Sequence, residues 1–249
     1  MTHSASMATP AAGASTAPAA PVTHDGPDLL LGAAVIAVAA AVVHALFFTP
    51  TEAMQGPAQK IFYIHVPSAI TALYLGFGLL SVTSAIYLWL REERVDRMAE
   101  SAAEVGLVFM TVVLLTGPIW AKPIWGTWWS WDARLTLTLF TWLIVLGYLT
   151  LRNAIEDRAQ RARYSAVLGI LAGLLVPFIH LSTTMFRTLH PQPILLKPSA
   201  PSMPHEMVMS WMYAQAAFVL LFVALLRARY RYAEERARLA ALRGGEEEL

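Results

Sequence analysis

The sequence predicts an all-α, polytopic integral membrane protein with six transmembrane helices. First, 57% of its 249 residues are hydrophobic and only 14% are charged, whereas a soluble domain has about 45–50% apolar and about 25% charged residues. Second, the apolar residues gather in six runs, each close to the roughly 20 residues that cross about 30 Å of hydrocarbon. These observations exclude an ordinary cytosolic enzyme, whose surface would be far richer in charged side chains.

The six expected helices are joined by short connections. They cover about residues 29–49, 65–90, 102–120, 134–151, 164–182 and 208–226. Residues 1–28 are rich in Ala and Pro and contain no Lys or Arg, so we expect a disordered tail rather than a secretory signal. The longest connection, about 183–207, is interrupted by prolines and leaves no room for a soluble domain. Residues 227–249 continue in helical spacing with mixed charges, which is typical of a charged cytoplasmic helix or tail.

The distribution of basic residues predicts the orientation. One set of alternate connections, together with the C-terminal stretch, carries 13 of the 18 Lys and Arg residues, and the other set carries five. Because basic residues stay cytoplasmic, both termini are expected in the cytoplasm and the connections at about 50–64, 119–133 and 183–207 on the outer face. The net charge of +1 argues against nucleic acid as a partner, since backbone binding needs a concentrated basic patch.

One outer connection, residues 119–133, holds most of the tryptophans. Five of the eight lie within twelve residues, namely Trp120, Trp125, Trp128, Trp129 and Trp131. An aromatic belt at the membrane interface is one interpretation. Belts usually spread over several helix ends, however, whereas this cluster occupies one short segment. A dense aromatic surface also suits a large, flat, apolar ligand that stacks on indoles, and haem has that shape.

Histidine is the candidate iron ligand, because the chain contains no cysteine for covalent c-type attachment or thiolate ligation. A b-type haem takes two neutral imidazoles from separate segments. His65 and His190 meet that requirement, and His65 is expected to open the second helix beside Pro67, a favourable first-turn residue. His180, inside the fifth helix, is a rival for the second position or else a packed core residue. His44 is a weaker candidate.

The two propionates of haem require cations or donors at the aqueous edge. Lys122, Arg134 and Arg187 are the outer-face cations near the candidate ligands. Arg134 could instead neutralise Asp132, and Asp132 is either the N-cap of the fourth helix or an acceptor that fixes the tryptophan segment. The sequence contains no recognisable nucleophile, acid–base pair or phosphate-binding loop, so we expect a binding and delivery protein rather than an enzyme.

Three segments resemble a known family. Residues 125–136, WGTWWSWDARLT, resemble the tryptophan-rich WWD signature of haem-handling proteins, and the WDARLT ending is similar to the CcmC family of cytochrome c maturation system I. Residues 60–67, KIFYIHVP, and 188–190, TLH, resemble that family at the expected order. The length and the six-span layout also match, so the likeness covers about residues 29–226, the expected membrane domain.

The resemblance implies that haem b is cargo on the periplasmic face of a bacterial inner membrane. It implies that the tryptophan segment, with Asp132, forms the haem platform, that His65 and His190 are the axial ligands, and that haem passes to the periplasmic chaperone CcmE. The ATP-binding-cassette pair CcmA and CcmB and the small protein CcmD would be the other partners. Two other functions remain open: the haem-attachment component of another cytochrome c maturation system, and a b-type cytochrome that carries electrons.

Overall fold

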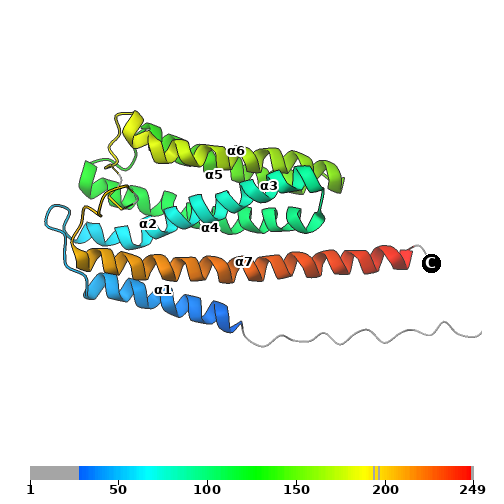
Figure 1. The fold of residues 1–249 in the computed structure, drawn as a ribbon, viewed down its shortest axis with the longest axis horizontal. Coiled ribbons are helices and arrows are strands. Elements are labelled where there is room, and N and C mark those ends of the chain that lie inside the picture. Colours follow the sequence, from blue (N-terminus) through cyan, green and yellow to red (C-terminus); the bar gives the residue numbers. More distant parts are fainter. Residues whose placement is uncertain (1–27, 193, 196, 248–249) are drawn as a thin grey trace, which may run out of the picture.

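The computed structural model describes residues 28–192, 194–195 and 197–247 (Figure 1). Apart from Asp28, the predicted N-terminal tail lies outside the described residues. Six helical segments in the described part are long and apolar enough to cross a membrane: Leu29–Phe47, Pro57–Leu90, Glu93–Trp125, Ala133–Ala154, Arg158–Met185 and His205–Arg243. The last five each contain one of the predicted apolar runs, and the first ends two residues before the predicted run 29–49 does. The prediction of an all-α fold with six spans is therefore confirmed.

The first two spans begin with different start signals. Helix α1 (Leu29–Phe47) is capped by the Asp28 carboxylate, which accepts hydrogen bonds from the backbone of Leu30 and Leu31 at 3.1 and 3.2 Å. The second span combines a 3₁₀ turn η1 (Pro57–Ile61), α2 (Phe62–Ile70), a π-helical segment η2 (Thr71–Phe77) and α3 (Gly78–Leu90). The expectation that His65 opens this span is wrong, because the helix extends outward to Pro57 and Pro67 lies in its interior.

The π-helical segment η2 is held by a close helix crossing. A Cβ atom on Gly76 would stand 2.7 Å from the Cα of Gly106 in the next helix, so the two backbones can approach only because neither residue carries a side chain. π-helical turns are rare and occur frequently at functional sites, because they shift the direction of the side chains around them. In this segment Tyr74 is 40% exposed, although its neighbours in the sequence are buried or partly buried.

Four further helices complete the chain: α4 (Glu93–Trp125), α5 (Ala133–Ala154), α6 (Arg158–Met185) and α7 (His205–Glu247). Helix α4 runs five residues past its expected end and takes in Trp120 and Trp125. It stops at Gly126, whose φ of 75° is a left-handed conformation that favours glycine. Helix α7 runs without a break into the charged C-terminal stretch, so its apolar and charged parts form one helix as far as the described residues reach.

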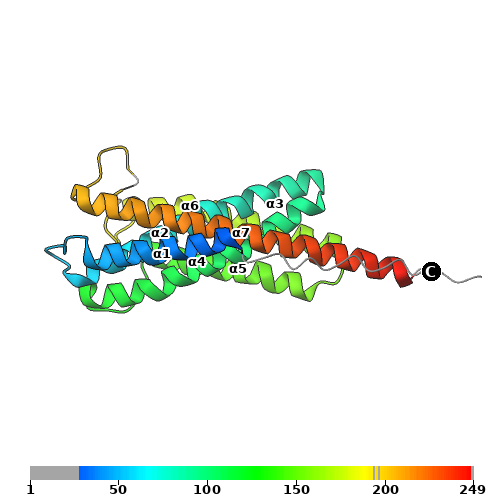
Figure 2. The same ribbon diagram turned by 90° about the horizontal axis from the view of Figure 1, so that it is seen from below.

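The helices run along a common axis (Figures 1 and 2). Helix α1 lies along the first half of α7, α5 lies beside α6, and the second span and α4 fill the space between these pairs. Connections 48–56 and 126–132 and the described parts of the connection between α6 and α7 gather at one end of the bundle, which we call the tryptophan end. The opposite end, which we call the arginine end, carries the turns after α3 and α5, the start of α1 and the end of α7.

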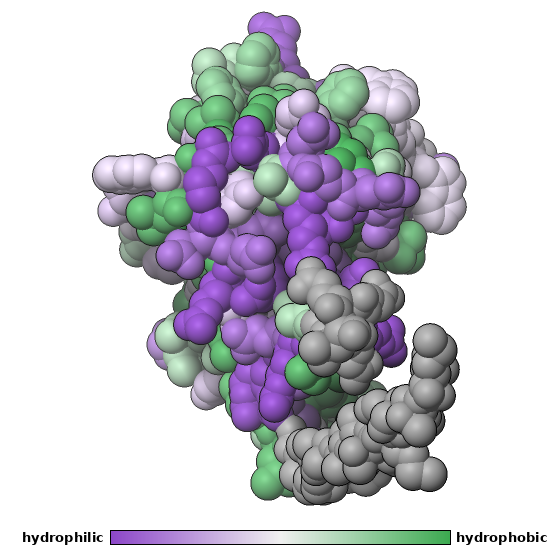
Figure 3. Space-filling view, turned by 90° about the vertical axis from the view of Figure 1, so that its right-hand side faces the viewer, coloured by the Kyte–Doolittle hydropathy of each residue, from purple (hydrophilic) through white to green (hydrophobic). Residues whose placement is uncertain are grey.

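Charged side chains at the arginine end join three helices. Arg152 of α5, only 6% exposed, donates to Asp96 of α4 at 2.7 and 2.8 Å and to Glu100 at 3.1 Å. Arg229 of α7 donates to Glu104 of α4 at 2.6 Å. Hydrophilic residues gather on this end of the molecule (Figure 3). Asp96, Glu100 and Glu104 of α4 are thus paired with arginines from two later helices.

Candidate functional site

His65 lies on α2 with one ring nitrogen already bonded. Its Nδ1 is 2.9 Å from the Thr116 hydroxyl of α4. The Thr116 hydroxyl donates its own hydrogen to the Val112 carbonyl at 2.7 Å, so it accepts the hydrogen of His65 Nδ1. A neutral His65 therefore has its lone pair on Nε2, which is the nitrogen available for a metal. Trp120 lies edge-on to this ring, with the ring centroids 5.7 Å apart.

His190 lies in the connection between α6 and α7. Its ring packs edge-on against Trp125, with the centroids 5.1 Å apart. Its Nδ1 is buried and has no hydrogen-bond partner among the described residues. Burial, and then the positive charge of Arg134, lower the pKa of His190 to about 3. The imidazole is consequently neutral at physiological pH, as a metal ligand must be.

Asp132 fastens the His190 connection to the start of α5. One carboxylate oxygen accepts the backbone N–H of Leu135 at 2.9 Å, which makes Asp132 the N-cap of α5. The other oxygen accepts from the Thr188 hydroxyl at 2.8 Å and from the Ser130 hydroxyl at 3.2 Å. Burial raises the pKa of the Asp132 carboxyl, but these hydrogen bonds outweigh burial and hold the pKa below its usual value. Both predicted roles, the cap and the fixing acceptor, apply to the same residue.

Arg134, the second residue of α5, is a partly buried cation. It lies within electrostatic range of His65, His190 and Tyr74. Within the described part of the chain, its guanidinium makes no hydrogen bond or ion pair, and the Asp132 carboxylate acts on it electrostatically without forming an ion pair. A partly buried arginine without an acceptor is costly. An anionic group bound next to Arg134 would therefore be stabilised by its charge.

The other two predicted cations lie at the surface. Lys122 is exposed and donates to the Gly126 carbonyl at 2.9 Å, where it completes the end of α4. Arg187 is exposed immediately after α6. The three predicted cations thus differ in burial, and Arg134 is the one in electrostatic range of both histidines.

The structure divides the tryptophans into two groups. Trp120 and Trp125, at the end of α4, face the two histidines, and the Trp120 indole donates to the Gln55 amide at 3.0 Å. Trp128 and Trp131 are 57% and 76% exposed. Trp129 packs edge-on against Trp131, and its indole N–H is buried without a hydrogen-bond partner among the described residues. The tryptophans that were predicted to form one platform thus lie in two groups. Trp120 and Trp125 contact the histidines, and Trp128 and Trp131 are exposed at the surface.

His180 is placed with a residue that the sequence did not single out. Its Nδ1 is 2.8 Å from the hydroxyl of Tyr74 in η2, and the two rings lie edge-on. Thr116 was also missed, although it precedes Trp120 by one helical turn and so lies on the same face of α4. That spacing was the one signal in the sequence that could have found it.

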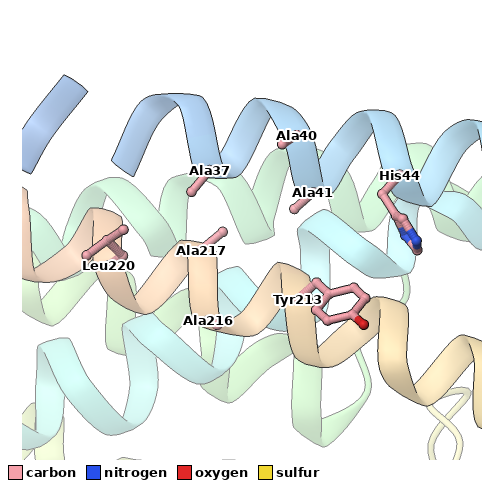
Figure 4. Close-up of a pocket in the computed structure, with 8 residues that line it drawn as sticks. All are labelled: Ala37, Ala40, Ala41, His44, Tyr213, Ala216, Ala217 and Leu220. Atoms are coloured by element: carbon pink, nitrogen blue, oxygen red, sulfur yellow. The ribbon is translucent and has the colours of Figure 1, made fainter. Parts of the chain in front are cut away.

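An apolar pocket lies between α1 and α7 (Figure 4). It has a volume of about 420 Å³ and is formed by small residues of α1 and α7, together with His44 and Tyr213. The lining residues are Ala37, Ala40, Ala41, His44, Tyr213, Ala216, Ala217 and Leu220. His44 packs edge-on against Tyr213, with ring centroids 5.4 Å apart. None of the other predicted haem residues lines this pocket.

The comparisons with known proteins agree on one family. The family model CcmC, described as Heme exporter protein C, matches residues 14–243, a range that contains every site residue above. The protein of that name from Bradyrhizobium diazoefficiens is 34% identical over 212 residues, which is 85% of this chain and 80% of the relative. Those from Paracoccus denitrificans and Haemophilus influenzae are 36% identical over 197 residues and 33% identical over 190. These matches cover 79% and 76% of this chain, and 81% and 77% of the relatives.

Proposed function

The chain belongs to the heme exporter protein C family, and from this premise we propose that it binds haem at its tryptophan end and passes it on for c-type cytochrome assembly. One observation carries the proposal. Two imidazoles from separate segments each lie edge-on to a tryptophan, and an arginine without an acceptor lies in electrostatic range of both. This combination of groups suits a planar iron porphyrin with acidic side chains, which takes axial imidazoles and cationic partners.

Each site residue has a distinct role in this proposal. His65 binds the iron of haem b through Nε2, since Thr116 occupies Nδ1, and His190 binds on the opposite face. Trp120 and Trp125 pack against the porphyrin edge, and Arg134 neutralises a propionate. Lys122 and Arg187 are exposed, so they can contact haem only at its aqueous edge.

The exposed tryptophans face outward for a partner. Trp128 and Trp131 present large apolar surfaces at the tryptophan end, and aromatic residues are enriched in the centres of protein interfaces. We assign this surface to the haem chaperone CcmE. ATP hydrolysis belongs to the CcmA and CcmB partners, with CcmD as a further component. The protein lies in the bacterial inner membrane with its arginine end in the cytoplasm, because basic residues stay on that side.

A spectrum of the purified full-length protein tests haem binding directly. Wild type should show the absorption of a bis-imidazole b-type haem. His65→Ala and His190→Ala should each lose most of the haem and change the spectrum, and added imidazole should restore part of it. His44→Ala is the matched control, because His44 also contacts an aromatic ring but lies in the pocket between α1 and α7. Haem binding that survives both His65→Ala and His190→Ala would remove the proposal.

Reporter fusions test the orientation. A reporter after Arg97 should lie in the cytoplasm and one after Trp131 in the periplasm, since the two positions are at opposite ends of α4 and its following connection. Placement of both reporters in one compartment would contradict the proposed topology.

A further inference from the structure

Tyr74 and His180 form a polar pair in the membrane-spanning part of the protein. The Tyr74 hydroxyl is 2.8 Å from His180 Nδ1, and Tyr74 is 40% exposed on η2. Polar side chains in membrane-spanning segments are rare and are often functional. Tyr74 lies on the π-helical segment η2, whose position is held by the Gly76–Gly106 crossing, and His180 reaches it from α6. These features point to a binding role rather than to packing alone.

Arg134 connects this pair to the histidine site. Its charge acts on Tyr74 as well as on His65 and His190. No side chain in the described ranges accepts a hydrogen bond from its guanidinium. The Asp132 carboxylate is already engaged by Leu135, Thr188 and Ser130. The Arg134 guanidinium therefore lacks a hydrogen-bond acceptor, and an anionic oxygen of a bound ligand could supply it.

We propose that Arg134 and Tyr74, the latter held by His180, form a carboxylate-binding subsite that receives a propionate of haem. This inference rests on the proposed function. In the bound state His180 donates its Nδ1 hydrogen to the Tyr74 oxygen, and the Tyr74 hydroxyl donates its hydrogen to the carboxylate. Arg134 supplies the compensating positive charge. His180 is then a positioning residue for Tyr74 rather than an iron ligand.

The subsite defines which way the porphyrin points. Tyr74 follows His65 by nine residues in the same span, which places it roughly 13 Å further from the tryptophan end along the helix. A propionate held there directs the acidic edge of haem into the bundle. The opposite edge then faces the exposed Trp128 and Trp131, where a partner protein can reach it.

The test compares haem with its dimethyl ester, in which both carboxylates are blocked. Each ligand is titrated by absorbance into the full-length protein in detergent, for wild type, Tyr74→Phe and Tyr213→Phe. Tyr74→Phe should weaken haem binding by roughly tenfold, because it removes a hydrogen bond to a charged group. It should leave ester binding within about twofold of wild type and leave the bis-imidazole spectrum unchanged. Tyr213→Phe is the matched control, since Tyr213 also packs edge-on against a histidine.

The outcomes separate this inference from the function on which it rests. Equal weakening of haem and ester by Tyr74→Phe would show a merely structural role and overturn the subsite. A changed iron spectrum in His180→Leu would make His180 a ligand and would also overturn it. If Tyr74→Phe does not fold, His180→Leu, which removes the support of the Tyr74 hydroxyl, should show the same loss that is selective for haem. Haem binding that does not depend on His65 and His190 would instead refute the proposed function.

Discussion

The hydrogen bond between His65 and Thr116 makes Thr116→Val an informative change. Valine has nearly the same shape as threonine but cannot accept the His65 Nδ1 hydrogen at 2.9 Å. The ring then has a buried donor without a partner, and its orientation and tautomer are no longer fixed. We expect the protein to insert and fold normally but to bind haem more weakly.

The expected loss of haem affinity follows from the one hydrogen bond that is removed. A buried donor left unsatisfied costs about 1–3 kcal/mol, and loss of a group that orients a metal-bound histidine typically costs about 10–100-fold in affinity. These two figures agree, because about 1.4 kcal/mol corresponds to tenfold in affinity. Thr116→Val should therefore weaken haem binding by about ten- to a hundredfold. Thr116→Ser retains the acceptor and should stay within a few-fold of wild type.

Absorbance titration of haem into the two Thr116 variants measures the effect. The same titration in a His65→Ala background tests the mechanism, because Thr116→Val should cost little once His65 is absent. Wild-type affinity in Thr116→Val, or an undiminished loss in the His65→Ala background, would refute the role of Thr116 in orienting the ligand.

Four further outcomes are expected. Because the pKa of His190 is lowered to about 3, its imidazole stays neutral and the haem spectrum should not change between pH 8 and about 5; an absorbance change centred near the ordinary histidine pKa of about 6.5 would contradict this. Asp132→Ala removes the cap of α5 and the hydrogen bond to Thr188, so it should lower the unfolding free energy by about 1 kcal/mol and also lower haem retention. Normal haem retention with reduced stability would show that the hydrogen bond to Thr188 has no role in haem binding. Replacing Trp128, Trp129 and Trp131 together should depress chaperone loading more than haem already bound, as measured by co-purification of CcmE, and normal loading would favour an interfacial aromatic belt. Arg152→Ala leaves the partly buried Asp96 carboxylate without its partner and should lower the unfolding free energy by about 2–3 kcal/mol, below the range for a fully buried pair, while the haem spectrum of the folded fraction stays unchanged.

Hydropathy predicted the spans well because each run is long, nearly free of charge and separated by polar connections. The helix ends were less predictable. The second span was expected to start at residue 65, but a 3₁₀ turn from Pro57 extends it. Helix α4 was expected to end near residue 120, but it continues to Trp125 until Gly126 provides a left-handed stop. Helix ends depend on individual capping residues, and a hydropathy average over many residues does not detect them.

Residue chemistry identified the candidate iron ligands but not the hydrogen bonds that orient them. His65 and Thr116 are separated by 51 residues, Asp132 and Thr188 by 56, and Tyr74 and His180 by 106. No local pattern encodes pairs so far apart, because helix packing decides which faces meet. The division of the tryptophans into an inner and an outer group has the same cause, since it follows from where α4 ends.

The acidic face of α4 has a consequence for biosynthesis. Asp96, Glu100 and Glu104 emerge from the ribosome long before their counterions, since Arg152 follows Glu100 by 52 residues and Arg229 follows Glu104 by 125. Unpaired carboxylates resist entry into hydrocarbon, so we expect Asp96 and Glu100 to stay at the bilayer surface until α5 supplies Arg152. Glu104 acquires its partner Arg229 only when α7 is made. Completion of the chain and completion of the bundle are therefore coupled events, and a nascent chain that stops before α7 keeps Glu104 exposed at the interface.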